Sequence, residues 1–83
     1  MSARNYARLW EQLGSILTAA LELERTAIGA AQAELVAEFI DHNEFGLAYE
    51  QLTDALSDAE LIPQDETARL LAEAANLMGN SED

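Results

Sequence analysis

The sequence predicts an all-α fold, a compact bundle of four amphipathic helices in a single domain over residues 1–83. Alanine, leucine, glutamate and glutamine dominate the composition, and all four favour helix. Apolar residues recur at three- and four-residue steps in four segments, as expected for helices that bury one face. A chain of 83 residues has room for one modest core rather than a deep, enclosed active site.

The boundaries of the first two helices follow from the points at which this periodicity weakens. We expect the first helix over residues 4–24, with a break or kink over residues 25–29, where two β-branched residues precede a glycine. The second helix should span residues 31–42. It should end at Asn43, because asparagine tolerates the left-handed conformation that often ends a helix.

The third helix is expected over residues 44–59, so close to the second that the two should form a tight corner or an antiparallel pair. Pro63 ends any continuation, because it lacks an N–H group and disfavours helix at the residue before it. The fourth helix should begin near residues 64–66, where acidic side chains suit a positive helix end, and stop at Gly79. Residues 80–83 are expected to form a frayed tail.

The apolar positions of these four segments form the predicted core. In chain order they are Tyr6, Leu9, Trp10, Leu13, Ile16, Leu17, Ala20, Leu21, Leu35, Val36, Phe39, Ile40, Phe45, Ala48, Tyr49, Leu52, Ala55, Leu56, Ala59, Leu70, Leu71, Ala74, Leu77 and Met78.

The charge of the chain is large and unevenly distributed. Sixteen acidic residues face four arginines and no lysine, so the formal net charge is −12. Residues 1–31 sum to zero, whereas residues 32–83 hold thirteen acidic residues against Arg69 alone. Such a field repels nucleic acid and anionic lipid and attracts cationic surfaces. We therefore expect no nucleic-acid or membrane partner, and a protein partner with a basic surface.

Three features predict a cytoplasmic location. No apolar run approaches the roughly 20 residues that span a bilayer. Residues 1–5 lack the apolar stretch of a secretion signal. The chain has no cysteine, which excludes disulfides and suits a reducing compartment.

The residue types that catalysis needs are scarce. His42 is the only histidine, and neither cysteine nor lysine is present to serve as nucleophile or base. The four glycines are isolated, so no phosphate-binding loop is formed. His42 falls at a predicted helix end, where a histidine usually helps to satisfy the terminal carbonyl groups. We expect no enzyme activity and no cofactor.

The best candidates for a metal site are Glu34, Glu38, Asp41 and His42, which lie within about two helical turns of each other. A metal site in a helical bundle needs inward-facing glutamates on several helices and paired Glu-x-x-His motifs. Here Glu38 and His42 are four residues apart, and the pattern occurs once. The twelve-residue calcium loop is also absent. No metal is therefore expected.

Carboxylates recur at three- and four-residue steps along the second and third helices, where like charges destabilise a helix by about 0.2–0.5 kcal/mol per pair. One interpretation is a pair of solvated faces that keep a small domain soluble. The absence of lysine favours the other, a surface that meets a cationic partner and speeds its capture. Tyr49 fits either the core or a contact with that partner. The candidate partner-binding residues are Glu34, Glu38, Asp41, Glu44, Tyr49, Glu50, Asp54 and Asp58.

Two residues beside the corner have different expected roles. Phe45 fits the core better than the surface. Gly46 lies inside a helical pattern, where glycine costs up to about 1 kcal/mol relative to alanine. Close helix packing at the corner is the favoured explanation for Gly46, and close approach by a partner is the alternative.

The segment over residues 38–52 resembles the central segment of MafI-type immunity proteins, small bacterial proteins that accompany polymorphic toxins. Its distinctive part is Glu-Phe-Gly-Leu-Ala at residues 44–48, followed by Glu50. An Ile-Pro turn at residues 62–63 and Met-Gly at residues 78–79 match later positions of that family, so the resemblance covers about residues 35–79. Asn43 stands where the family favours glycine, and asparagine is the next best residue for a left-handed turn.

The resemblance implies binding and inhibition of a cognate toxin, commonly a nuclease. Together with the charge pattern, it gives our leading hypothesis, an immunity protein that occludes a cationic toxin domain with an acidic helical face. One alternative is a helical scaffold or regulatory homodimer with Tyr6 and Trp10 at its seam. Another is a metal-dependent carboxylate enzyme.

Overall fold

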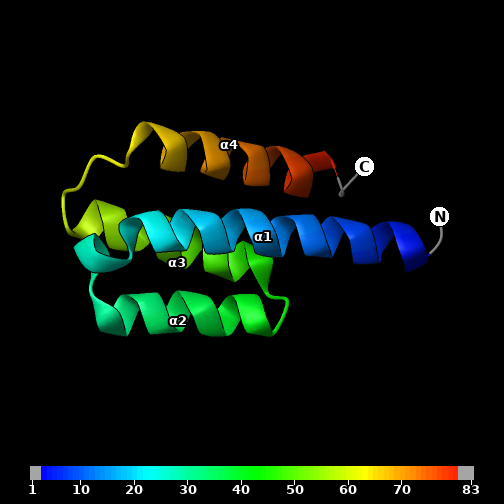
Figure 1. Cartoon of the computed structure of the whole chain (residues 1–83), viewed down its shortest axis with the longest axis horizontal. Coiled ribbons are helices and arrows are strands. Elements are labelled where there is room, and N and C mark those ends of the chain that lie inside the picture. Colours follow the sequence, from blue (N-terminus) through cyan, green and yellow to red (C-terminus); the bar gives the residue numbers. More distant parts are fainter. Residues whose placement is uncertain (1–2, 81–83) are drawn as a thin grey trace.

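The computed structural model describes residues 3–80 of the chain, with side chains from residue 7 to residue 79, and forms four α-helices (Figure 1). This confirms the predicted all-α bundle. None of the helices in the described part combines the length and apolar character needed to cross a membrane. The four are α1 (Ala3–Ile28), α2 (Ala30–Asp41), α3 (Phe45–Asp58) and α4 (Asp65–Asn80).

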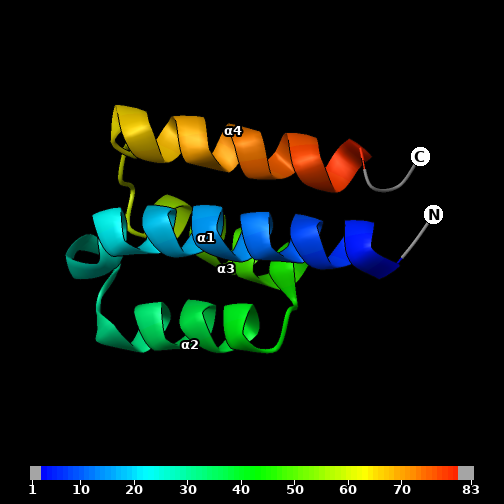
Figure 2. The same ribbon diagram turned by 45° about the vertical axis from the view of Figure 1, so that its right-hand side comes forward.

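Helix α1 is the longest and contacts the other three helices. Helices α2 and α3 run antiparallel as a hairpin on one side of α1, and α4 packs mainly on the other side (Figures 1 and 2). Within residues 3–80, α2 and α4 do not contact each other. The outer side of α2 is therefore left without a covering helix.

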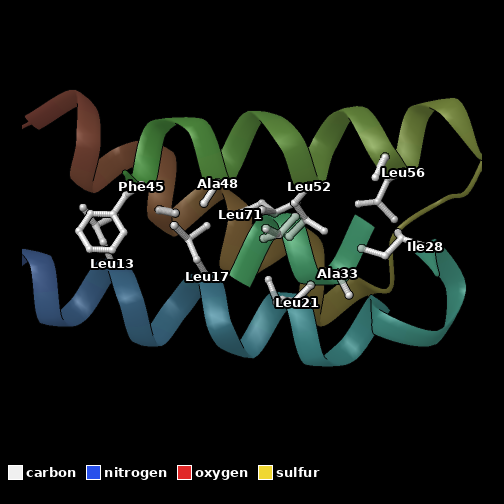
Figure 3. Packing of buried hydrophobic residues seen from close by; sticks show 14 residues of the cluster. Leu13, Leu17, Leu21, Ile28, Ala33, Phe45, Ala48, Leu52, Leu56 and Leu71 are labelled. Carbon is white, nitrogen blue, oxygen red and sulfur yellow. The ribbon is translucent and has the colours of Figure 1, made fainter. Parts of the chain in front are cut away.

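The core lies where α1 faces the hairpin and α4 (Figure 3). Its largest fully buried apolar side chains are Leu17, Leu21, Val36 and Leu52. Tyr6, which the periodicity assigns to the core, lies outside the described side chains. The other buried apolar residues are Leu13, Ala20, Ile28, Ala33, Phe45, Ala48, Ala55, Leu56, Leu71 and Ala74, and the partly buried ones that pack against them include Leu9, Ile16, Phe39, Ile40, Tyr49, Leu70, Leu77 and Met78.

Three residues predicted to belong to the core are instead exposed. Trp10 is 47% exposed, although Leu9 beside it packs against the core. Leu35 lies on α2, which packs on α1 and α3 alone, and its side chain faces solvent. Ala59 is the C-cap residue of α3 and lies beyond the packed part of that helix.

A buried carboxylate attaches the start of α4 to the end of α1. Glu24 is only 4% exposed, and its Oε2 accepts a hydrogen bond from the backbone N–H of Gln64, at 2.9 Å. The side chain of Gln64 makes a second hydrogen bond to α1, in which Nε2 donates to the carbonyl oxygen of Leu23, also at 2.9 Å. Thr67, one turn into α4, is fully buried. Apolar periodicity did not predict either buried polar residue, because it assigns polar residues to the surface.

Three helix ends lie at residues with a positive φ angle. Gly29 has φ 92° and separates α1 from α2, so the expected break occurs there, one turn later than the predicted helix end. Asn43 has φ 59°, which confirms its predicted conformation. Its N–H donates to the Ile40 carbonyl while the Glu44 N–H donates to the Phe39 carbonyl, the paired bonds of a Schellman motif.

The same motif ends α3, at a residue that the sequence did not identify. Glu60 has φ 56°, and its N–H donates to the Ser57 carbonyl. The N–H of Leu61 donates to the carbonyl of Leu56, and these two leucines supply the apolar pair that often accompanies this cap. The chain then passes Pro63 and enters α4 at Asp65.

Candidate partner-binding surface

The acidic candidates lie on the α2–α3 hairpin. All seven carboxylates are exposed, whereas Tyr49 is half-buried and packs against the core. Tyr49 therefore has a structural role whatever its contact with a partner. We call the exposed set the acidic face; it comprises Glu34, Glu38 and Asp41 on α2, Glu44 at the corner, and Glu50, Asp54 and Asp58 on α3.

Helical geometry directs these carboxylates away from the core. Each residue of an α-helix turns by about 100°, so residues two apart lie on nearly opposite sides. Glu38 follows the fully buried Val36 by two residues, and Asp54 lies two residues from both Leu52 and Leu56, which are buried. The same side chains that build the core thus place the acidic stripes on the outer surface.

Two features hold the stripes in a fixed relation to each other. Gln51 Nε2 on α3 donates to Gln32 Oε1 on α2 at 2.6 Å, in a partly buried position. The corner between the helices is closed by the Schellman bonds at Asn43 and Glu44. The hairpin therefore offers a preformed surface, and a partner need not order it on binding.

No arginine of the described residues forms an ion pair with the acidic face. Among the described side chains, the one ion pair joins Arg25 to Glu22 on α1, with Nη2 and Oε2 2.6 Å apart. The α2–α3 carboxylates repel one another at helical spacing, and none of them is paired with an arginine whose side chain the structure describes. The imidazole of His42, at the end of α2, is the basic group that interacts with Glu38, Asp41 and Glu44. A cationic surface brought against this face would turn repulsion into attraction.

His42 has a structural role at the end of α2. Its Nδ1 donates to the carbonyl oxygen of Glu38 at 2.8 Å, which confirms the prediction that it satisfies a terminal carbonyl group. This hydrogen bond is the main cause that raises the pKa of His42 above its ordinary value of 6.5, and the carboxylates of Glu38, Glu44 and Asp41 add to it. Desolvation opposes the rise.

The metal candidates do not converge. Across the described residues, no group of three or more histidine, aspartate or glutamate side chains is placed to hold a metal ion. The ring of His42 is directed to the backbone of its own helix by the hydrogen bond from Nδ1.

Gly46 is not explained by packing. It is exposed, and a Cβ atom built on it would meet no atom of the described residues within 4 Å. The prediction that Gly46 permits close helix packing at the corner is therefore wrong. The fold leaves open space at this position, two residues after Glu44 in the chain.

Sequence reasoning missed a shallow groove between α1 and the corner. It has a volume of about 450 Å³ and is lined on the α1 side by Trp10, Glu11 and Gly14, and on the hairpin side by Ile40 and Phe45 among others. The available signal in the sequence was the tryptophan at position 10, which the apolar periodicity assigned to the core. The sequence did not show that the corner lies opposite it, because the two segments are about thirty residues apart.

No family model matches this chain, and searches of curated proteins and of solved structures likewise found no match.

Proposed function

We propose that this chain is an immunity protein, which binds a cognate polymorphic toxin and neutralises it. The partner is a toxin domain with a basic surface, as nuclease domains commonly have because their substrate is a polyanion. The observation that carries the proposal is the acidic face, an exposed and preformed set of carboxylates that forms no ion pair with an arginine of the described residues. The likeness of residues 38–52 to MafI-type immunity proteins supports the same assignment.

Inhibition in this proposal is steric and electrostatic and involves no chemistry. The acidic face occupies the cationic groove that the toxin uses for its substrate, so the inhibitor and the polyanion compete for the same charges. The net charge of −12 steers the toxin towards the inhibitor over distances beyond direct contact. Rapid capture suits a protein that protects its own cell. Binding takes place in the cytoplasm, where the toxin would act.

The test is binding and protection with the toxin domain encoded beside this chain. Calorimetry should give a 1:1 complex with a dissociation constant well below micromolar, and co-expression should restore growth to cells that make the toxin domain. No binding tighter than micromolar, together with no rescue of growth, would reject the proposal.

A second candidate function is a scaffold or regulatory homodimer. The exposure of Trp10, Leu35 and Leu47 favours it, because large exposed apolar side chains often mark an interface. Light scattering separates the two functions. A dimer that persists at high salt and ignores charge reversal at Glu38 and Asp54 would favour the scaffold, whereas a monomer favours the immunity protein.

A further inference from the structure

We infer that the groove between α1 and the α2–α3 corner receives an apolar side chain from a basic segment of the partner. We call it the Trp10 groove; its apolar part is formed by Trp10, Ile40 and Phe45. This inference rests on the proposed function and adds to it a site that is not part of the acidic face. The acidic face would supply attraction, and the groove would supply the anchor.

The shape of the groove fits a protruding side chain. Its volume of about 450 Å³ falls within the range of roughly 300–1,000 Å³ that is usual for binding pockets. Gly14 contributes no side chain to the floor of the groove. The ring of Phe45 lies close to it, because a Cβ atom built on Gly14 would be 3.7 Å from Phe45 Cε1. Phe45 is only 7% exposed, so this floor is fixed by the core. Trp10 forms a large, half-exposed aromatic wall, and tryptophan is among the residues most enriched at binding hot spots.

The charge around the groove determines which occupant fits. Glu11 is the one charged residue in its described lining, and Asn43, which also lines it, lies between Asp41 and Glu44 of the corner. His42 donates its Nδ1–H to its own helix. An apolar side chain flanked by lysine or arginine would therefore meet an apolar floor, with the Glu11 carboxylate in the lining and two further carboxylates next to Asn43 in the sequence. A second copy of this chain would instead bring two acidic corners together, each on a molecule of net charge −12.

Trp10 is the single tryptophan of the chain, so a spectroscopic label on tryptophan reports on the groove alone. The protein labelled with 5-fluorotryptophan gives one ¹⁹F resonance, which can be followed while the unlabelled toxin domain is added. We expect this resonance to shift on complex formation. We also expect Trp10→Ala to weaken binding tenfold or more, because truncation of a buried aromatic anchor has an effect of at least that size.

Ile62→Ala is the matched control. Ile62 is 93% exposed in the loop between α3 and α4, at the end of the bundle away from the corner (Figure 1). Its truncation should leave affinity within about twofold, as expected for contacts outside a hot spot. Circular dichroism should show both variants folded, since neither side chain belongs to the core.

The outcomes separate this inference from the proposed function. If the wild-type chain binds the toxin domain while its ¹⁹F resonance stays unshifted and Trp10→Ala binds equally well, the Trp10 groove is not the anchor site and the immunity function stands. If the wild-type chain does not bind, both proposals are overturned.

Discussion

Replacing Glu24 with alanine should destabilise the bundle more than any other single change of an acidic residue. The carboxylate is 4% exposed and accepts the Gln64 N–H at 2.9 Å, at the positive end of α4. A hydrogen bond to a charged group contributes about 1.5–3 kcal/mol, and the favourable helix-end charge adds about 0.3–1 kcal/mol. We therefore expect Glu24→Ala to lower the free energy of unfolding by about 2–4 kcal/mol. A domain of this size is stable by only about 4–12 kcal/mol in total.

Two further variants show which part of the interaction matters. Glu24→Gln keeps an oxygen acceptor but loses the charge, so it should cost about 1–2 kcal/mol. Glu22→Ala removes an exposed carboxylate two residues away, whose pair with Arg25 should contribute about 0.2–0.5 kcal/mol. Urea unfolding followed by circular dichroism at 222 nm measures all three. The reasoning is refuted if Glu24→Ala costs no more than Glu22→Ala.

The remaining predictions concern helix ends and the histidine. Gly29→Ala should destabilise the fold by about 1–3 kcal/mol, because φ is 92° there. Gly46→Ala should stabilise it by up to about 1 kcal/mol, because the helical site has open space; a change of the opposite sign for either variant in urea unfolding would contradict the assignment of that glycine. Glu60→Gly should stabilise by about 0.5–1 kcal/mol relative to Glu60→Ala, because φ is 56° at this position; thermal unfolding that shows no difference would argue against a left-handed residue. The pKa of His42 measured by NMR should exceed 6.5. The stabilisation by the protonated imidazole is then present below pH 6.5 and lost as pH rises through the folded pKa. The difference in unfolding free energy between wild type and His42→Gln should therefore shrink with rising pH, and a difference that stays constant would contradict this.

Local sequence signals were sufficient for most of the fold. Periodicity located all four helices, and the asparagine at position 43 identified the corner, because its conformation depends on its own neighbours. Glu60 adopts the same conformation without such a signal, since glutamate is not a usual left-handed residue. At Glu60, the Schellman hydrogen bonds and the apolar pair of Leu56 and Leu61 stabilise the left-handed conformation, although glutamate by itself disfavours it.

Features that depend on which helices become neighbours could not be predicted in this way. The link from Glu24 to Gln64 joins residues 40 positions apart, and nothing local marks this glutamate as buried. Leu35 and Trp10 both fit their apolar stripes, yet each lies where no second helix covers it. The carboxylates of the acidic face are exposed because helical spacing places them opposite the core, whereas their contact with a partner stays a prediction.

The most direct measurement for the proposed function is the association rate constant with the toxin domain as a function of salt. Glu38→Gln with Asp54→Asn removes two charges from the acidic face, and Glu66→Gln with Glu73→Gln removes two exposed charges from α4. We predict that the wild-type rate constant falls about tenfold or more from low to high salt. The hairpin variant should associate more slowly at low salt and show a shallower salt dependence, whereas the α4 variant, which loses the same net charge, should change much less. Equal rate constants for the two variants at every salt concentration would show that the acidic face does not meet the partner.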